Sequence, residues 1–339
     1  MPQWLFPVSA LNQTPSFKTS AIPLGKELYD RARGVELLYR LGTSLALPSS
    51  AMFTAATWFH RFYMRYSMED YHRQDVAASC IFLATKTEEC GRKLKDVAKV
   101  FQMKITGVEA DSIPTNSKEV EQRQTAILLT EEALLEALCF DFVVDSPHAD
   151  LVDLFRARDE EPILQEYAWS FAHDSYRTPL CVLYPPRIIA AACYVLAQCI
   201  VEGPHSPSLD ARISFPPPTA TLPTPPSHKP ASPDASRFAI EYFGFKDLEL
   251  LAVADSLSII LEFYGAQYIQ GSTDHLQPIM EISAPSHSPP RPQLYQPFSQ
   301  FSGNLQGPAG IQQSQGRTPS SSHGGSTPLK TSSRTHLSL

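Results

Sequence analysis

The chain has 339 residues, 43% of them hydrophobic, which is enough to build a sizeable core, and its formal net charge is −7. An acidic chain argues against broad binding to a phosphate backbone. Its longest apolar run, residues 188–200, is too short to cross a bilayer and is expected to be a core helix. We therefore expect no membrane partner and no direct binding of nucleic acid.

Proline is distributed unevenly, with ten of the 30 prolines in residues 201–235 and nine in 271–339. Both stretches lack apolar periodicity and are rich in Ser, Thr and Gln, so they cannot bury enough surface to offset chain entropy. We predict a disordered insertion at about 203–235 and a disordered Ser/Pro/Gln-rich tail at 269–339. The N-terminal segment 1–23 is expected to be flexible.

The remaining residues form two foldable blocks, 24–145 and 146–268. Apolar residues recur there at helical spacing and no alternating strand pattern persists, so the fold class is all-α. The first block is expected to hold five helices, at 24–45, from a cap at Ser49–Ser50, at 71–86, at 93–103 and at about 120–140. The helix at 71–86 is apolar almost all round, which indicates a helix buried among the others.

The second block repeats the pattern of the first. The run AASCIFLA at 77–84 is answered by AAACYVLA at 190–197, an offset of 113 that also places His60 on His173 and Tyr63 on Tyr176. A match held at one spacing across two helices indicates internal duplication. The chain is therefore predicted to contain two copies of one five-helix unit, the second interrupted by the proline-rich insertion and closed by helices within 237–264.

No catalytic constellation can be assembled from the sequence. The six cysteines include no C-x-x-C pair and are expected to be buried thiols without metal. Residues 72–75 read HRQD, like part of a kinase catalytic loop, but the glycine-rich loop, V-A-I-K and D-F-G are missing. We expect a helix start there, no enzyme activity, and no cofactor bound by the chain itself.

Charged residues end the apolar run, because Lys86 and then Glu88–Glu89 follow it directly. A cation near a helix C-terminus is favoured by the helix dipole. A basic cluster follows, for which a solvated helix start is the plainer interpretation and an RNA or activator contact the alternative; it comprises Arg92, Lys93, Lys95 and Lys99.

These features carry a family resemblance. The stretch WFHRFYMRYSMEDYHRQDVAASCIFLATKTEECGRKLKDV, residues 58–97, resembles the H-R-F-Y-M … F-L-A-x-K-x-E-E … K-x-x-D-V pattern of transcriptional cyclins, and the likeness extends to GVELLYRLG at 34–42 and LTEEALLEALCFDF at 129–142. The resemblance implies tandem cyclin boxes, an N-terminal one at 24–145 and a C-terminal one at 146–268. Cyclin K, cyclin T and the fungal beta subunit of the RNA polymerase II C-terminal-domain kinase are the most similar.

The resemblance also implies site residues. In cyclins, a lysine that ends the third helix and a glutamate on the fifth grip the mobile C-helix region of a cyclin-dependent kinase; here they correspond to Lys86 and Glu131. Both charges are expected to be kept free for that partner, because their equivalents in the second copy are Cys199 and Ala254. Further kinase contacts are expected from Glu89, Leu135, Phe140 and Phe142.

The implied function is that of a nuclear regulatory subunit that activates a kinase allosterically. The kinase would bind ATP and magnesium and phosphorylate the RNA polymerase II C-terminal domain. The M-R-A-I-L-like patch with which cell-cycle cyclins dock substrates is not seen at 31–42, so docking by such a patch is not expected. Alternatives are a cyclin C/L-like subunit of another transcriptional or splicing kinase, or a general transcription factor of the TFIIB type that binds promoter DNA.

Two sites in the tail fit phosphorylation by a bound kinase. Ser288 and Thr327 are each followed by proline at +1 and a basic residue at +3. A kinase held on the same complex would meet them at high local concentration.

Overall fold

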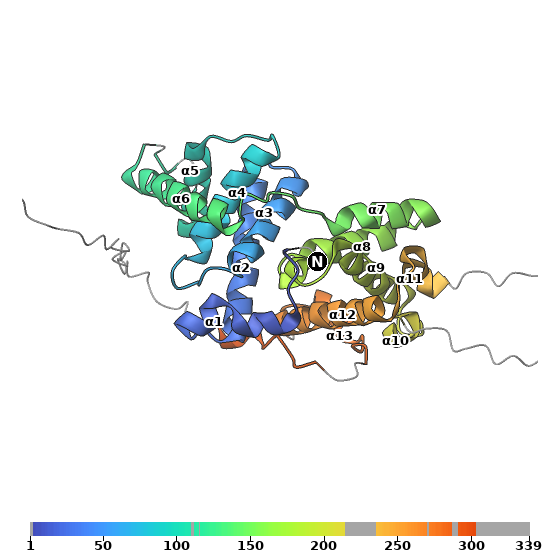
Figure 1. The fold of residues 1–339 in the computed structure, drawn as a ribbon. Helices are drawn as coiled ribbons and strands as arrows, with labels where there is room; N and C mark the ends of the chain where they lie inside the picture. The colour runs from blue at the N-terminus through green and yellow to red at the C-terminus, as the bar shows by residue number, and fades with distance from the viewer. Residues whose placement is uncertain are drawn as a thin grey trace, which may run out of the picture. The chain divides into compact units, whose positions relative to one another are not determined.

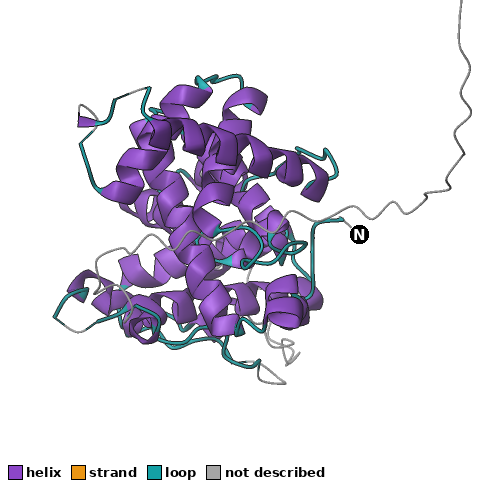
Figure 2. Ribbon diagram, turned by 90° about the vertical axis from the view of Figure 1, so that its left-hand side faces the viewer, coloured by secondary structure: helices purple, strands orange, loops and turns teal. Residues whose placement is uncertain are grey.

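The computed structural model describes residues 3–109, 112–114, 116–213, 235–269, 271–286 and 291–302. Within these ranges every regular element is a helix and no strand occurs (Figure 2). The all-α class predicted from apolar spacing is confirmed.

The first five-helix unit follows the predicted order. It comprises α2 (Leu24–Ser44), α3 (Ser49–Phe62), α4 (Arg73–Thr87), α5 (Leu94–Thr106) and α6 (Lys118–Ala137). Helix α4 packs against each of the other four (Figure 1). All of its residues from Val76 to Thr85 are buried. A helix that is apolar all round can be surrounded in this way, which explains why α4 is central.

The second unit has the same organisation. It comprises α7 (Pro147–Arg158), α8 (Pro162–Ser175), α9 (Pro186–Glu202), α11 (Phe238–Phe243) and α12 (Asp247–Gln267). Helix α9, the counterpart of α4, contacts the other four and is buried from Ile188 to Cys199 (Figure 1). Gly244, at φ +61°, ends α11 in the left-handed conformation that glycine adopts at little cost.

Residues matched by the duplication meet where the two units pack together. His60 Nε2 lies 2.8 Å from the carbonyl oxygen of Tyr176, and the ring of Phe53 stacks on that of Tyr176 at 5.0 Å. Tyr39 donates a hydrogen bond to the carbonyl of His173 at 3.1 Å. These polar groups are thus satisfied across the junction between the two units. The buried hydrophobic residues nevertheless form two clusters, one centred on each unit.

The predicted cap of α3 is wrong in detail. The helix starts at Ser49 as expected, but its N-cap position is Pro48 and no side chain caps it. Proline suits this place because its fixed φ favours entry into a helix. The face of the helix that packs on the core is buried throughout: Met52, Ala55, Ala56, Phe59 and, just after the helix, Tyr63.

The N-terminal segment is packed rather than flexible, so the prediction for 1–23 is wrong over its described part. It contains the 3₁₀ helix η1 (Val8–Gln13) and helix α1 (Pro15–Ser20). Leu11 is fully buried, and Thr14 donates a 2.6 Å hydrogen bond to the buried carboxylate of Glu27. Single buried anchors at irregular spacing leave no periodic signal, which is why the sequence did not reveal this packing.

The predicted insertion at about 203–235 is folded at its start. Helix α10 (Leu209–Ile213) packs on α9 and α12, and the fully buried Arg212 pairs with Glu202 at 2.5 Å. The short 3₁₀ helix η4 (Ala235–Arg237) closes the other end. Residues 214–234 lie outside the described part of the chain.

The tail predicted to be disordered at 269–339 is likewise ordered in part. It forms η5 (Asp274–Leu276), α13 (Gln277–Met280) and η6 (Phe298–Gln300). Tyr295 is 1% exposed and Leu294 is 6% exposed. Ile279 is also buried. Ser288 and Thr327, the two predicted phosphorylation sites, lie outside the described residues. The low apolar content of the tail gave no indication of these buried side chains, which depend on contacts far away in the sequence.

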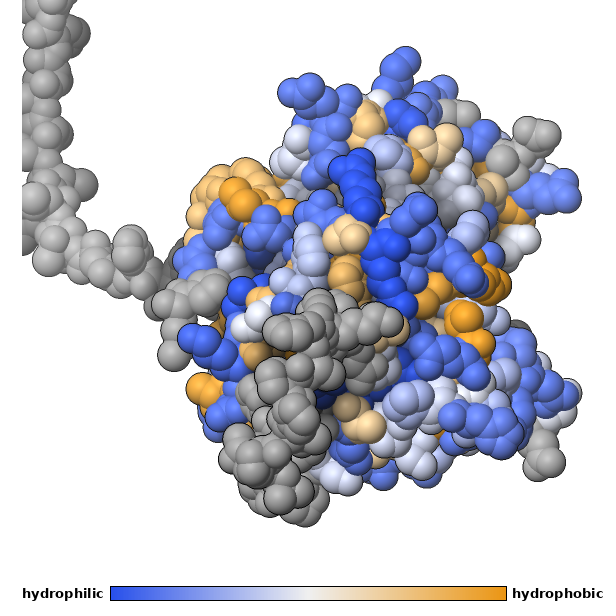
Figure 3. Space-filling model, turned by 90° about the vertical axis from the view of Figure 1, so that its right-hand side faces the viewer, coloured by the Kyte–Doolittle hydropathy of each residue, from blue (hydrophilic) through white to orange (hydrophobic). Residues whose placement is uncertain are grey.

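On the face shown in Figure 3, hydrophobic residues form separate patches among hydrophilic ones. In the described part of the chain, none of the helices has the length and apolar character needed to span a bilayer.

Candidate functional site

The structure brings the two predicted site charges together. Lys86, in the last turn of α4, places Nζ 2.6 Å from Glu131 Oε1 on α6. Lys86 also lies over the ring of Phe82, 4.5 Å from its centre. The prediction that both charges are kept free for a partner is therefore wrong for the isolated chain, because each is already engaged by the other.

The pair is only partly closed to solvent. The side chain of Lys86 is 47% exposed and that of Glu131 is 9% exposed. The contact between the ammonium group and the carboxylate is an ion pair. An ammonium group has three N–H donors. Lys86 can therefore hold Glu131 in place and still donate to an acceptor on another molecule.

The second unit does not reproduce this pair. Cys199 and Ala254, at the matching positions of α9 and α12, are 7% and 3% exposed. A charge pair needed for the fold itself is expected in both copies. Its presence in one copy alone is more typical of a binding surface.

Helix α6 continues the surface with apolar residues. Leu128 is 47% exposed and Leu129 is 65% exposed, whereas Leu135 is half-buried. Leu128 and Leu135 stand three residues before and four after Glu131, which places all three on one helix face. The sequence analysis missed Leu128 and Leu129. The spacing of three residues between Leu128 and Glu131 was a usable signal for Leu128 alone.

The turn after α6 presents an exposed aromatic ring on an unusual backbone. Cys139 and Phe140 both have positive φ, 52° and 57°, and Phe140 is 65% exposed. Left-handed conformations cost non-glycine residues about 1–2 kcal/mol each. Phe142 is half-buried against Trp58, with ring centres 5.8 Å apart. Strain combined with an exposed aromatic ring is typical of a contact site.

Glu89 also lies beyond the end of α4 with positive φ, at 53°, and is exposed. Its neighbour Glu88 is used internally, because Glu88 Oε1 accepts a 2.8 Å hydrogen bond from Thr54. The two adjacent carboxylates thus have different roles: Glu88 links the end of α4 to α3, and Glu89 is exposed to solvent.

Trp4 supports the aromatic turn from the N-terminal segment. Its indole N–H donates a 2.9 Å hydrogen bond to Asp141 Oδ2, and the guanidinium groups of Arg61 and Arg65 lie 5.0 and 5.6 Å from its ring centre. The same arginines donate to the carbonyls of Val143 and Ala137. The hydrogen bond from Trp4 lowers the pKa of Asp141. Trp4 is a functional candidate that the sequence analysis missed.

The first unit also matches a known family. Residues 13–143 match the family described as Cyclin, N-terminal domain. This match shows that the first unit is similar to the cyclin N-terminal domain. The cyclin resemblance drawn from residues 58–97 is thereby confirmed, and all six predicted contact residues lie inside the matched cyclin segment.

Several curated cyclins are similar in sequence. Cyclin pch1 of Schizosaccharomyces pombe is 42% identical over 202 residues, covering 58% of this chain and 57% of the relative. Cyclin-T1-3 of Oryza sativa is 34% identical over 197 residues, covering 57% and 40%. Cyclin-K of Homo sapiens is 32% identical over 200 residues, covering 58% and 33%. The match thus spans between a third and three fifths of each relative's length.

Two solved structures share the fold of this chain at low sequence identity. A chain of the yeast RNA Pol II CTD kinase CTDK-1 complex aligns with a TM-score of 0.56 and 16% identity, covering 77% of this chain and 73% of that one. A chain of the yeast TFIIK complex aligns with a TM-score of 0.50 and 17% identity, covering 76% and 96%. At such identities the likeness concerns the fold alone.

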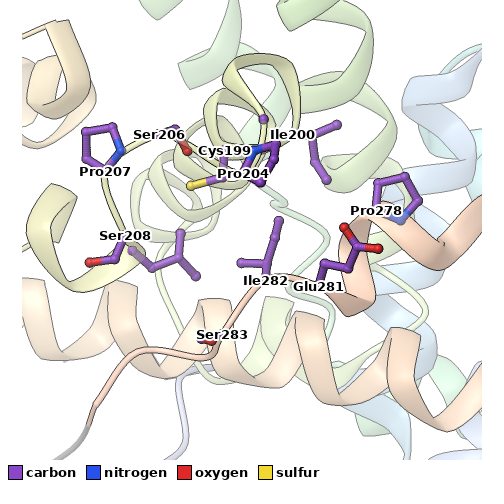
Figure 4. Close-up of a pocket in the computed structure, with 12 residues that line it drawn as sticks. Cys199, Ile200, Pro204, Ser206, Pro207, Ser208, Pro278, Glu281, Ile282 and Ser283 are labelled. Carbon is purple, nitrogen blue, oxygen red and sulfur yellow. The ribbon is translucent and has the colours of Figure 1, made fainter.

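A cavity of about 340 Å³ lies in the second unit (Figure 4). The end of α9, with Cys199 and Ile200, forms one wall, and Glu281 and Ile282 form another (Figure 4). Burial raises the pKa of the Cys199 thiol. A thiol held protonated is a poor nucleophile, so burial does not activate Cys199 for covalent chemistry.

The remaining motifs have structural roles. His72 is the N-cap of α4 and accepts from the backbone N–H of Gln74, and Arg73 pairs with Asp30 at 3.2 Å. Arg92 donates to backbone carbonyls, among them that of Leu45 at 2.8 Å. Among the described residues, no group of three or more His, Cys, Asp or Glu side chains could hold a metal ion.

Proposed function

We propose that the chain is the regulatory subunit of a nuclear cyclin-dependent kinase that phosphorylates the RNA polymerase II C-terminal domain. The observation that carries the proposal is the half-exposed Lys86–Glu131 pair, beside exposed leucines of α6 and the exposed Phe140, within the matched cyclin segment. The similarity to cyclins of the K and T types supports the choice of kinase class.

The proposed mechanism assigns no chemical step to this chain. The kinase binds ATP and magnesium, and its C-helix must be held inward to complete the ion pair that positions ATP. Lys86 would donate to an acceptor on that helix region, while Leu128, Leu135 and Phe140 would cover its apolar side. Because Glu131 already orders the lysine, less side-chain entropy is lost on binding than for a free lysine.

The paired geometry makes a charge-swap experiment informative. Lys86→Glu and Glu131→Lys each leave a like-charge pair and are expected to lower kinase capture from native extract about 30-fold or more. The double variant restores an ion pair of reversed direction. It should regain the helical content and melting temperature of the wild type, yet still fail to capture the kinase, because the partner meets the wrong charge.

Glu132→Lys, at the exposed neighbouring position, serves as the matched control and should leave capture within about twofold of wild type. Captured protein is identified by peptide sequencing. Recovery of wild-type capture by the swapped double variant would show that the pair serves only the fold, and the proposal would then be rejected.

A further inference from the structure

A second feature of the first unit is a hollow of about 100 Å³ between three helices. Side chains from α2, α4 and α5 line it: Arg33, Glu36, Leu37, Arg40, Arg73, Gln74, Lys104 and Ile105. We refer to these eight residues as the cationic hollow. Four of them are cationic and one is a carboxylate, in a chain whose net charge is −7.

Two of the four cations are compensated within the chain. Arg33 pairs with Glu36 at 2.5 Å, and Arg73 pairs at 3.2 Å with Asp30, a carboxylate that it shares with Lys26. Neither Arg40 nor Lys104 has an ion-pair partner in the part of the chain that the structure describes. Two uncompensated positive charges thus converge on one hollow from different helices, α2 and α5.

The local structure adds to this positive field. Arg73 and Gln74 are the first two residues of α4, so the positive end of that helix dipole is at the hollow. Leu37, which is 8% exposed, and Ile105 also line the hollow, so the effective dielectric beside the cations is lower than in bulk water. Like charges gathered there repel one another, and a bound anion would reduce that repulsion.

We propose that the cationic hollow binds the phosphoryl group of a phosphorylated serine or threonine in a peptide. Such a group carries a charge of about −1.5 to −2 and three strong acceptor oxygens. Arginine presents paired N–H donors that match those oxygens, and lysine adds a point charge. A doubly charged ligand also fits the two uncompensated cations.

The same geometry disfavours nucleic acid. A phosphate backbone needs a track of cations several phosphates long. Here the cations converge on one small hollow, with the carboxylates of Asp30 and Glu36 in ion pairs beside it. A single phosphorylated side chain avoids these flanking negative charges better than a polyanion does.

This inference goes beyond the proposed function and rests on it only in the choice of probe. A kinase subunit that binds a phosphorylated product would keep the complex on a substrate with many sites, since the next site is then presented at high local concentration. The probe is a synthetic fluorescent peptide with two Ser-Pro steps, prepared with and without one phosphoserine. Binding to the full chain is followed by fluorescence anisotropy at fixed ionic strength.

We expect the phosphorylated peptide to bind about tenfold or more tightly than the unphosphorylated one, and Arg40→Ala/Lys104→Ala to abolish that difference. Lys99→Ala is the matched control, since Lys99 also lies on α5 but does not line the hollow. It should leave the phosphate preference unchanged. Inorganic phosphate should compete with the phosphopeptide.

Equal affinity for the two peptides would overturn the inference. An equal loss in the Lys99→Ala control would do the same, because it would reveal unspecific charge attraction. Preferential binding of single-stranded RNA over the phosphopeptide would assign the hollow to nucleic acid instead. Kinase capture by Arg40→Ala/Lys104→Ala should equal that of wild type, so failure of this inference and failure of the proposed function are told apart.

Discussion

The protonation state of His60 is determined by its burial at the junction of the two units. Its ring lies between Arg31 and the second unit, with Nδ1 3.3 Å from Arg31 Nη1 and Nε2 2.8 Å from the carbonyl oxygen of Tyr176. The guanidinium can only donate and the carbonyl can only accept, so the neutral tautomer with hydrogen on Nε2 satisfies both. Burial, with a further contribution from Arg31, lowers the pKa of His60 from 6.5 to about 3.

This shift predicts acid sensitivity of the folded chain. The unfolded chain takes up the proton first as pH falls, so stability from neutral His60 is complete above about pH 6.5 and is lost towards pH 3. One such group lowers the free energy of unfolding by up to about 1.4 kcal/mol per pH unit. Urea titrations between pH 7 and 5 measure the slope, in a window where most carboxylates stay ionised.

His60→Gln should flatten that slope, although it also lowers stability at pH 7. Part of the slope should persist, because burial lowers the pKa of His148 as well, to about 4. His275→Gln changes an exposed histidine and should leave the slope as in wild type. An unchanged slope in His60→Gln would contradict the assignment of a neutral, buried imidazole.

At the scale of elements, the sequence predicted the helices whose apolar residues recur at regular local spacing. Apolar spacing identified the five helices of the first unit, and the offset of 113 predicted a second copy without placing α7 or α8. The all-apolar run at 77–84 identified α4 as buried among the other helices, and the matching run at 190–197 indicated the same for α9. The position of Lys86 near a helix end followed from the same pattern. Its pairing with Glu131 did not, because 45 residues separate the two and no local rule relates them.

The predictions of flexibility and disorder in the irregular segments were wrong for the same physical reason. Trp4 hydrogen-bonds to Asp141 across a separation of 137 residues. Arg212 is buried although it belongs to a five-residue helix, α10, which is too short to be stable on helix propensity alone. Such segments are ordered by tertiary contacts of a few anchors. Composition, which averages over many residues, therefore predicted flexibility at 3–23 and 209–213, where the structure has packed helices.

The N-terminal segment allows a test of whether one element positions another. Trp4→Ala removes a buried ring and the hydrogen bond to Asp141, and large-to-small changes of this kind cost about 3–5 kcal/mol. We expect faster amide hydrogen exchange in residues 137–143 and weaker kinase capture, since Phe140 loses its support. Phe17→Ala, at a 45% exposed position of the same segment, is the control and should change neither measurement. Unchanged exchange at 137–143 in Trp4→Ala would show that the turn is held without the tryptophan.

For the described molecule as a whole, the first part of the tail joins the two units. Glu262 of α12 accepts from Arg291 Nη2 at 2.5 Å and from the backbone N–H of Leu294 at 2.7 Å. Further along, the ring of Phe298 meets that of Tyr29 on α2 at 5.2 Å. Residues 291–302 therefore connect the last helix of the second unit to the first helix of the first.

This connection predicts a global effect of a local deletion. A chain that ends at Ser286 loses Arg291, the buried Leu294 and Tyr295, and the contact with Tyr29, whereas a chain that ends at Ser302 keeps them all. Each lost kcal/mol lowers the melting temperature by about 2–4 °C for a domain of 150–250 residues, so a drop of about 5 °C or more is expected. Because the segment contacts both units, calorimetry should show the whole transition moving rather than a new, earlier one splitting off. Equal melting temperatures for the two truncations, or loss of one unit alone, would mean that residues 291–302 lie against the surface without holding the units together.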